Sequence, residues 1–589
     1  RQEGRGILLG TYEKAAKPWS PVTTPWDFGH ELLAPDLDRI APSLEIGFRH
    51  FPPYEKAGIK TVINGPFTFA PDGNPLVGPV QGLTNFWCAC AVMAGFSQGG
   101  GVGLALANWM VEGDPGHDIF AMDVARYGEW ATLRYTNAKV RENYSRRFSI
   151  RFPNEELPAA RPAETTPLYD IMLRDNFAVM GDSWGLETPL WFAPSAEEAH
   201  DVLSFHRSND FEHVGAEVRG VREHVGVTEI ANFAKYEVTG QGAEAWLDHL
   251  MTNTMPKVGR LVLSPMLNER GKLIGDFTIA RAAQTRFLIW GSLAASRYHM
   301  RWFERHLPAD GSVRVHRFHT DLVGLMLAGP KTRAVLAALV DTDVSNDAFR
   351  FMDFREMDVA GAPCMVNRIT YTGDLGYEIW MKPSFQRRVY LAIKTAGQAH
   401  GIVDFGMRAL LSMRLEKNFP TWFAELRPIY GPFEGAMDRF VKLQKPDFIG
   451  RAAAVAERDA GPRLRRVSLM IEAGDADVLG DEPIWAKVGA DHGTIEQPHG
   501  YGAPRFDATG QEMPRPDPVR DGDWRVVGWV TSGGYAHWVQ VSMAQGYLPA
   551  ALAERGEAGL FAVEIMGERR AARIALEPPF DPAGERMRM

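Results

Sequence analysis

The segment SPMLNERGKLIGDFTIA (264–280) decides how the rest of this sequence is interpreted, because it predicts a β-hairpin with a carboxylate in its second strand. The run NERG (268–271) is typical of a hairpin turn. The residues after it, 273–280, are predicted to form the second strand of the hairpin. Asp276 lies in the middle of that strand.

Alternation of side chains along a strand puts Asp276 on one face together with Ile274 and Thr278. A carboxylate in such apolar surroundings must find partners or acquire a raised pKa. Either outcome suits a group that accepts a proton or binds a protonated heterocycle. The alternative is an Asp276 that faces solvent on an edge strand.

A second candidate site lies in ITYTGDLGYEIWM (369–381). The residues between Thr372 and Gly376 predict a turn, so that Tyr371 and Glu378 flank a chain reversal and can face the same region. A glutamate accepts two hydrogen bonds from an N–C–N edge of the kind that a pterin or a guanine presents. The alternative is a surface hairpin with a solvated glutamate.

The rest of the chain combines helical and strand patterns. From residue 168 to about 446, strand-like runs alternate with amphipathic helices, and Arg414 and Glu416 are expected to make local ion pairs on one of these helices. Residues 462 to 579 hold short strand-like runs separated by Gly, Asp and Pro, which favours a small β-barrel or sandwich. The sequence therefore predicts an α+β multidomain protein.

Glycines gather near the N-terminus, where Gly95 and the run GGGVG (99–103) precede the apolar helix LALANWMV. Consecutive glycines at a helix N-terminus allow the backbone to approach a flat or anionic group. The alternative is a turn that serves close packing of a helix on a strand. Upstream, Cys88 and Cys90 lie on one face of a predicted strand, and we expect both to be buried as small apolar side chains.

The composition excludes several classes of function. A net charge of −9 and a pI near 6 argue against a surface for nucleic acid or an anionic membrane. There is no run of 18 apolar residues, and three cysteines give no disulfide framework and fit a reducing compartment. We expect a soluble protein of the cytoplasm, or of the mitochondrial matrix in a eukaryote.

Common chemical motifs are missing as well. The sixteen histidines form no HExxH or paired spacing, so no metal site is expected. There is no P-loop and no GxGxxG between a strand and a helix. Gly240-Gln241-Gly242 enters an amphipathic helix and is not a dinucleotide fingerprint.

The sequence resembles the C-terminal three-quarters of the dimethylglycine dehydrogenase and sarcosine dehydrogenase family. In this family a glycine-oxidase-like flavoprotein domain is fused to an aminomethyltransferase-like folate domain. The order and spacing of many short stretches carry the resemblance. They are RQEGRGILLGTYE, ELLAPDLDRI, VINGPFTFAPDGNPLVGP, GGGVG, GDSWGLETPLWF, FAKYEVTGQGAE, MPKVGRLVLSPMLNERG, YTGDLGYE, MRLEK, VKLQKPDFIGR, VTSGGY and EPPFDPAGERMR.

The resemblance implies four parts along the chain. Residues 1–125 correspond to the C-terminal part of an FAD-dependent amine oxidoreductase domain, and 126–165 form a connecting segment. Residues 166–455 correspond to a tetrahydrofolate-binding aminomethyltransferase-like domain, and 456–589 to the C-terminal β-barrel of the same module.

The resemblance also implies roles for particular residues. Asp276 falls beside the reactive edge of the folate as a catalytic and folate-binding residue, and Tyr371 and Glu378 fall where the family contacts the pterin. Tyr12 falls where a tyrosine faces the amine substrate near the flavin. The backbone that passes close to the flavin ring is implied to lie at Gly95, Gly99, Gly100 and Gly101.

The activity implied is oxidative N-demethylation of a methylated glycine or related amine, with FAD and tetrahydrofolate as cofactors. The one-carbon unit passes to tetrahydrofolate as 5,10-methylenetetrahydrofolate. The substrate is a small N-methyl amine of the dimethylglycine or sarcosine type, and the electron acceptor is left open.

Two departures from the family bear on these expectations. The nucleotide-binding half of the flavin domain is absent from this sequence, so a second polypeptide or a further segment is expected to complete the FAD site. The alternatives are a folate-dependent demethylase without its own flavin, and a folate-binding or assembly subunit that works with a partner chain carrying the redox site. In addition, Leu410 stands where aminomethyltransferases carry an arginine, so the charged tail of the folate must be recognised by other residues.

Overall fold

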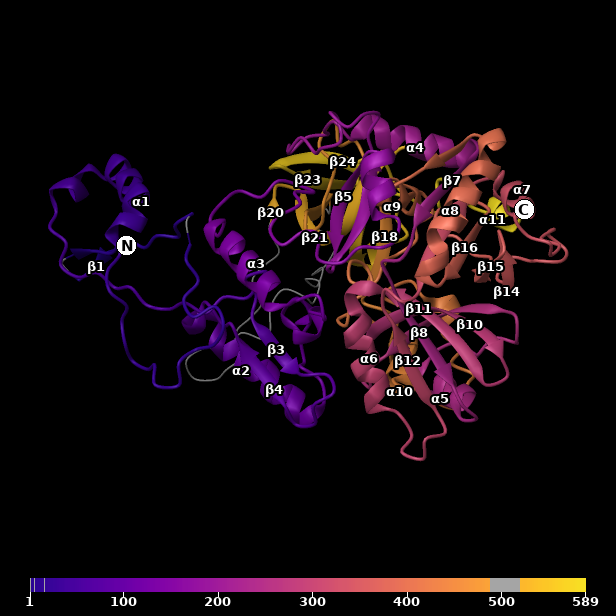
Figure 1. Cartoon of the computed structure of the whole chain (residues 1–589), viewed down its shortest axis with the longest axis horizontal. Coiled ribbons are helices and arrows are strands. Elements are labelled where there is room, and N and C mark those ends of the chain that lie inside the picture. The colour runs from indigo at the N-terminus through magenta and orange to yellow at the C-terminus, as the bar shows by residue number, and fades with distance from the viewer. Residues whose placement is uncertain (1, 5, 15, 488–519) are drawn as a thin grey trace. The chain divides into compact units, whose positions relative to one another are not determined.

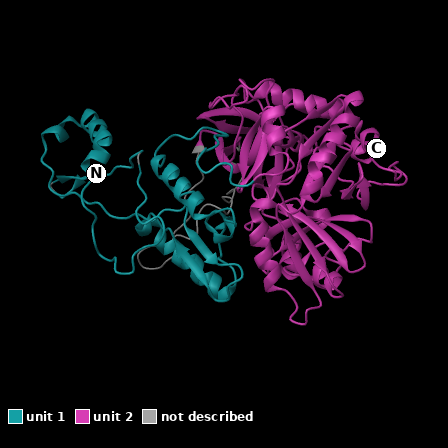
Figure 2. Ribbon diagram, in the orientation of Figure 1, with its two compact units in different colours: residues 1–164 teal, residues 165–589 magenta. Residues whose placement is uncertain are grey.

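The structure, a computed structural model, describes every residue except 1, 5, 15 and 488–519. The chain divides into two compact units, residues 1–164 and residues 165–589 (Figure 2). We call them unit 1 and unit 2 and describe each by itself.

Unit 1 consists of short strands and three helices with long connections. Its core includes Trp109, whose ring packs so closely on Gly78 that a Cβ there would lie 2.6 Å from it. An ion pair between Arg126 and Asp72 (2.7 Å) holds the connection after the second helix. The main elements are α1 (Leu37–His50), β3 (Leu76–Pro79), β4 (Trp87–Cys90), α2 (Gly95–Glu112) and α3 (Leu133–Ser145), preceded by the two-residue strands β1 (Gln2–Glu3) and β2 (Gly6–Ile7).

The expected strand around the first two cysteines is present, but the expected burial of both thiols is wrong. β4 pairs with β3 alone in a two-stranded sheet, so much of its surface has no covering layer. Cys90 is exposed and Cys88 is half-buried.

The first sheet of unit 2 has five antiparallel strands in the order β12-β8-β11-β10-β9. Figure 1 labels β8, β10, β11 and β12 of this sheet. The hairpin expected at residues 268–271 joins β9 to β10, and the Asn268 side chain accepts hydrogen bonds from the amides of Arg270 and Lys272. The strands are β8 (Phe233–Thr239), β9 (Leu261–Leu267), β10 (Leu273–Ala283), β11 (Arg286–Ser292) and β12 (Arg314–Phe318).

The second sheet of unit 2 has six strands in the order β14-β15-β16-β13-β7-β17, of which β17 runs parallel to β7. The hairpin expected in 369–381 is the connection from β15 to β16. The strands are β7 (Val225–Glu229), β13 (Val323–Ala328), β14 (Phe354–Val359), β15 (Ala362–Asn367), β16 (Gly376–Met381) and β17 (Ile402–Asp404).

A core of apolar side chains joins the two sheets, and we call it the inter-sheet core. It contains Ala280 and Trp290 from the five-stranded sheet and Met326 and Trp380 from the six-stranded sheet. A hairpin and two helices also contribute to it, namely β5 (Ala178–Ser183) with β6 (Leu186–Phe192), α4 (Phe211–Glu223) and α9 (Met407–Glu416).

The opposite face of the five-stranded sheet packs on two helices in a separate core, which we call the helix-side core. Phe277 and Ile279 of β10 lie in it with Met300 and Phe303. The helices are α5 (Ala243–Leu250) and α6 (Ser296–Arg305). Helices α7 (Thr332–Ala337) and α8 (Pro383–Gly397) cover the outer face of the six-stranded sheet, and α10 (Arg451–Ala460) comes later in the chain.

The last part of unit 2 is a small barrel. Its strand order is β19-β23-β24-β18-β22-β21, and pairing of β19 with β21 closes the ring, with the short β20 attached to β21. The strands are β18 (Leu464–Ile471), β19 (Pro483–Lys487), β20 (Arg520–Asp521), β21 (Trp524–Ala536), β22 (Val541–Pro549), β23 (Phe561–Ile565) and β24 (Glu568–Ile574). The predicted α+β multidomain fold with a C-terminal barrel is confirmed.

Candidate folate site

Asp276 lies in the middle of β10 and faces the inter-sheet core, not the helix-side core. The prediction that it shares a face with Ile274 is wrong, whereas Thr278 does lie on its face. The register of β10 on β9 shifts between Leu273 and Gly275, and this bulge turns Ile274 into the helix-side core with Phe277. A β-bulge opposes two residues to one and so reverses the alternation beyond it.

The Asp276 carboxylate has few partners. It accepts a hydrogen bond from its own backbone amide, and no other described group is bonded to it. Burial, and then the nearby charge of Glu425, raise its pKa to about 7. A carboxyl whose pKa lies near neutral pH can both hold and release a proton under ordinary conditions.

Tyr371 stands beside Asp276 and is held at both its ring and its hydroxyl. The hydroxyl donates to the carbonyl of Pro420 (2.7 Å), and the ring stacks on Phe419 with centroids 5.9 Å apart. Burial raises the pKa of the Tyr371 hydroxyl to about 12, and charges on Arg414 and on the Asp276 carboxylate act on it as well. The phenol is therefore neutral and is presented as a rigid side chain.

Glu378 lies on β16 with its carboxylate on the same face as Trp380, toward the inter-sheet core. It accepts hydrogen bonds from the Asn367 side-chain amide (3.1 Å) and from the Trp380 indole (3.4 Å). Burial raises the pKa of Glu378 to about 7. The Trp380 ring lies 5.7 Å from that of Trp290 on the other sheet, so Glu378 lies where the two sheets meet. Asp276 and Tyr371 thus lie close enough to interact electrostatically, and all three side chains face the inter-sheet core.

A loop that no pattern in the sequence indicated supports this cluster. Glu425 is completely buried and accepts from Arg414 (3.1 Å) and from the backbone amide of Thr421 (2.9 Å). Its other oxygen accepts from Thr531 (2.9 Å) and from Ser532 of the barrel strand β21. Glu425 therefore fastens the loop that carries Phe419 and Pro420 to the barrel. Arg414 makes an ion pair as expected, but with a residue outside its own helix.

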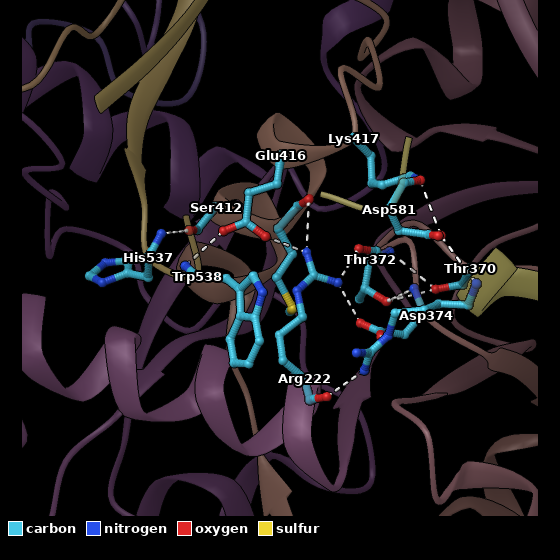
Figure 3. A network of polar contacts seen from close by, with 12 residues as sticks. Arg222, Thr370, Thr372, Asp374, Ser412, Glu416, Lys417, His537, Trp538 and Asp581 are labelled. Atoms are coloured by element: carbon cyan, nitrogen blue, oxygen red, sulfur yellow. Dashed lines mark hydrogen bonds and ion pairs between the residues drawn. The ribbon is translucent and has the colours of Figure 1, made fainter. Parts of the chain in front are cut away.

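A buried polar network holds the turn that follows Tyr371 (Figure 3). The guanidinium of Arg222 on α4 donates to the Thr372 carbonyl (2.7 Å) and bonds to the carboxylates of Asp374 and Glu416. All three charged side chains are completely buried. Arg586, near the end of the chain, bonds to the second oxygen of Asp374 (2.7 Å).

The same network reaches the barrel and the C-terminal segment. Glu416 accepts from the backbone amide of Trp538 (2.8 Å), and the Arg222 guanidinium lies over the ring of Phe580 at 3.6 Å. Glu416 is therefore structural, as expected, but its partners lie far away in the sequence. Together these contacts fix the position of the turn next to Tyr371.

In unit 1, Tyr12 lies in an aromatic cluster. Its ring is 4.9 Å from that of Tyr144, 5.0 Å from Phe148 and 6.1 Å from Phe67. Tyr12 is half-buried, so part of its surface is accessible. Its role toward an amine substrate stays a prediction.

The expected glycine turn in unit 1 is not a turn. Helix α2 already begins at Gly95, so Gly99, Gly100 and Gly101 lie inside the helix and not before it. The apolar residues that come next, which pack through Val102, Ala105 and Trp109, extend the helix back through the glycines. A Cβ added at any of these four glycines would meet no atom within 4 Å, so their surface is open.

The residues of the Asp276 site fit a pterin. A pterin presents N–H donors and ring acceptors along one edge, and the carboxylate of Glu378 is suited to the donors. The Asn367 carbonyl oxygen and the Trp290 indole nitrogen are both buried and lack hydrogen-bond partners among the described residues. Both atoms are therefore free to bond to a polar ligand between the sheets.

Three family models match the chain, and the change from one module to the next falls near the boundary between the two units. Residues 168–445 match the glycine cleavage T-protein N-terminal domain, and residues 503–581 match the C-terminal barrel domain of that protein. Residues 112–166 match the central domain of FAD-dependent oxidoreductases. The Asp276 site thus lies within an aminomethyltransferase module.

Known proteins show the same relationship. The chain is 35% identical to mouse dimethylglycine dehydrogenase over 98% of its own length and 63% of that protein. It is 30% identical to the aminomethyltransferase of Chloroherpeton thalassium over 44% of its length and 71% of that protein. The solved aminomethyltransferase T of Bartonella henselae covers 71% of this chain with a TM-score of 0.55 at 22% identity, and 98% of that structure is matched.

Residues 165–589 therefore have the fold of an aminomethyltransferase, preceded by part of an oxidoreductase module. Over nearly its whole length the chain is homologous to dimethylglycine and sarcosine dehydrogenases, and its aminomethyltransferase module belongs to the family of aminomethyltransferases. The chain spans a little under two thirds of the length of the dimethylglycine dehydrogenases it matches.

Two further observations concern the described part of the chain alone. None of its helices is long and apolar enough to cross a membrane. No group of three or more His, Cys, Asp or Glu side chains there is arranged to hold a metal ion.

Proposed function

We propose that this chain supplies the folate-binding part of an enzyme that oxidatively removes an N-methyl group from a methylated glycine or a related amine. The one-carbon unit would pass to tetrahydrofolate as 5,10-methylenetetrahydrofolate. The observation that carries the proposal is the Asp276 carboxyl, which is half-buried and without a side-chain partner, in an aminomethyltransferase module.

Each residue of the site has a chemical task in this proposal. Tetrahydrofolate, when bound, supplies the ring nitrogens that accept the one-carbon unit. Glu378 would accept hydrogen bonds from the amidine-like edge of the pterin, and Tyr371 would pack against it. Asp276 would hold or release a proton at its carboxyl oxygen, for which a pKa of about 7 is suitable. Fixing these groups before the ligand binds increases the effective concentration of the reacting partners.

The residues present do not by themselves fit FAD. The glycines expected at the flavin lie inside helix α2, and no glycine-rich loop between a strand and a helix cradles a phosphate in the described part of unit 1. We therefore assign no chemical step to a flavin held by this chain alone. FAD remains part of the proposal as a group completed by further protein.

We propose that a second polypeptide or a further segment completes the flavin site by packing on unit 1. Twenty-one large apolar side chains are exposed in the described part of its 164 residues, against twelve in the much larger unit 2. Such a density of exposed apolar residues is unusual for a finished surface. Phe96, Leu104 and Val111 of α2 are among them, next to the open glycines.

The alternative function is a folate-binding or demethylase subunit that has no flavin of its own. The position of Gly99, Gly100 and Gly101 within a helix favours this alternative for the isolated chain. Absorbance in the flavin region separates the two. Purified chain that binds added FAD with a visible spectrum supports an intrinsic flavin site, and chain that stays colourless supports the subunit.

The folate half is tested by titrating the full chain with tetrahydrofolate and following tryptophan fluorescence or heat. Glu378→Gln is expected to weaken binding at least tenfold. Glu269→Gln, which changes an exposed carboxylate on the hairpin of Asp276, is expected to leave binding unchanged. Absence of binding to the unaltered chain would refute the proposal.

The substrate is proposed only by class. The small amine expected from the family differs among its members by a methyl group or a short tail, which a binding site distinguishes by about 1–3 kcal/mol. The electron acceptor stays open, and the compartment, cytoplasm or mitochondrial matrix, stays a prediction. The mouse relative is named as a mitochondrial protein.

A further inference from the structure

The bulge in β10 decides where the Asp276 side chain points. Leu273 pairs with Leu267 and Gly275 with Met266, so Ile274 is the extra residue between them. Beyond the bulge the register is regular as far as Ala280. Without the extra residue, Asp276 would share the face of Ile274.

The side chains on either side of β10 show the effect. Ile274, Phe277 and Ile279 lie together in the helix-side core. Ala280, two strand intervals from Asp276, lies in the inter-sheet core. The bulge therefore allows Ile274 to be buried on one side while Asp276 reaches the site on the other.

His299 of helix α6 holds this bulge from the helix-side core. Its Nε2 lies 2.9 Å from the carbonyl oxygen of Ile274, the extra residue. Because a carbonyl only accepts, Nε2 carries the hydrogen and donates it. The ring is fully buried and packs edge-on against Phe277 with centroids 4.7 Å apart. Burial lowers the pKa of His299 to about 3, so the ring is neutral.

The surroundings leave this arrangement little freedom. A Cβ at Gly275 would lie 2.7 Å from the ring of Phe277 and 3.0 Å from Nε2 of His299, so a side chain at that position would displace one of them. The His299 ring also packs against that of Trp422, with centroids 5.2 Å apart, and Trp422 belongs to the loop whose Pro420 carbonyl accepts a hydrogen bond from the Tyr371 hydroxyl. His299 thus touches both segments that form the site.

We propose that His299 is a positioning residue: its hydrogen bond to the Ile274 carbonyl maintains the bulge that directs Asp276 into the folate site. The consequence for folate rests on the proposed function, but the orientation of Asp276 is a property of the chain itself. The charged and titratable groups near Asp276 are Glu425, from the supporting loop, and Tyr371, with Arg414 acting on Tyr371. None of them contacts the bulge from the helix side.

Two variants of similar volume isolate the hydrogen bond. His299→Gln keeps an N–H donor, and His299→Met removes it. The unaltered chain and the two variants are each made with and without Asp276→Asn, and the melting temperatures of these six proteins are measured at pH 5 and pH 8. Phe303→Leu, with and without Asp276→Asn, is the control for damage to the same helix and core.

The expected result concerns the effect of Asp276→Asn. In the unaltered, His299→Gln and Phe303→Leu backgrounds, Asp276→Asn should become more favourable for stability as the pH rises from 5 to 8, because it removes a carboxyl that resists ionisation. In the His299→Met background this gain should fall to less than a third. An equal gain in the His299→Gln and His299→Met backgrounds, or the disappearance of the gain in both, would overturn the proposal.

A measurement without variants covers the case in which His299→Met does not fold. Nitrogen NMR of the chain labelled at histidine should show His299 with its hydrogen on Nε2 throughout pH 5 to 9. A hydrogen on Nδ1, or a charged ring at pH 5, would contradict the bond to Ile274.

Titration with tetrahydrofolate then tests the functional consequence. His299→Met should bind tetrahydrofolate as weakly as Asp276→Asn, and His299→Gln should bind it within about twofold of the unaltered chain. If the unaltered chain binds no tetrahydrofolate, the proposed function fails, whereas melting and NMR still decide the role of His299.

Discussion

Asn367 and Glu378 lie opposite each other on β15 and β16, and the side-chain amide of Asn367 donates a 3.1 Å hydrogen bond to the Glu378 carboxylate. Because an ionised carboxylate only accepts, this bond fixes the orientation of the amide. The amide oxygen is left buried without a partner among the described residues. The pair therefore offers several acceptor oxygens on one face, which suits the N–H groups of a heterocycle.

Replacing Asn367 with leucine should weaken folate binding in a pH-dependent way. The variant loses the donor that stabilises the Glu378 carboxylate, so the pKa of Glu378 should rise further. At pH 7 the affinity for tetrahydrofolate should fall about five- to tenfold, and the loss should be smaller at pH 8.5. Equilibrium titrations at the two pH values measure this. An equal loss at both would show that Asn367 acts by packing alone.

Folate binding itself should depend on pH through Glu378. Since the pKa of Glu378 is raised to about 7, the carboxyl is largely protonated at pH 6 and must ionise to accept two hydrogen bonds. Affinity should therefore increase between pH 6 and 8, by up to about tenfold per pH unit below the pKa. Calorimetry in buffers of different ionisation enthalpy should detect the released proton. Glu378→Gln should bind weakly and with a flatter pH profile.

Asp276→Asn should become more favourable for the stability of the chain as the pH rises. The folded-state pKa of Asp276 is about 7, above the roughly 3.9 of an unfolded chain, so the folded form binds the extra proton between these values. The stability that this proton contributes is complete below about pH 4 and is lost as the pH rises through 7. Asp276→Asn should therefore gain on the order of 1–3 kcal/mol relative to the unaltered chain between pH 5 and pH 8. If the unfolding free energies of Asp276→Asn and the unaltered chain differ by the same amount at pH 5 and pH 8, the raised pKa is contradicted.

Removing the guanidinium of Arg222 should be strongly destabilising. Arg222→Met leaves the buried carboxylates of Asp374 and Glu416 without their shared partner, at a cost of about 3–5 kcal/mol. The matched control is Arg387→Met, which breaks an exposed ion pair with Asp170 in the same unit and should cost less than about 1 kcal/mol. Chemical unfolding of the two variants makes the comparison. Similar losses for both would show that the network of Figure 3 is not the support of the Tyr371 turn.

The glycines of helix α2 offer a test in unit 1. Gly100 lies inside the helix, and a Cβ there meets nothing within 4 Å. Gly100→Ala should therefore stabilise the helix by about 0.5–1 kcal/mol, because alanine loses less backbone entropy on folding. Thermal unfolding followed by circular dichroism measures the change. A loss of stability would argue for a turn at this position.

The parts of the site that depend on local pattern could be predicted from the sequence. Asp276 stood out because a carboxylate within an apolar strand must be accommodated, and Glu378 and Tyr371 because they flank a recognisable turn. The barrel could be inferred from its short strands and turn residues. The resemblance to a family supplied the link between these positions and folate.

Other features could not be predicted because they depend on residues distant in the sequence. The bulge in β10 reverses the alternation at Ile274, and its support, His299, belongs to a helix 25 residues later. The partners of Arg222 lie 150 residues and more along the chain. The glycine run suggested a turn, since glycine disfavours helix, but the packing of Trp109 and its neighbours overrides that preference.

The bond between Arg586 and Asp374 has a consequence for how the protein is made. These residues are 212 positions apart, with the whole barrel between them. On the ribosome, the turn beside Tyr371 emerges long before Arg586 is translated, and contacts between such distant residues form late. A nascent chain should therefore hold both sheets before its folate site is rigid, and the ability to bind a ligand should be acquired only after the last helix, α11 (Glu585–Arg588), has been synthesised.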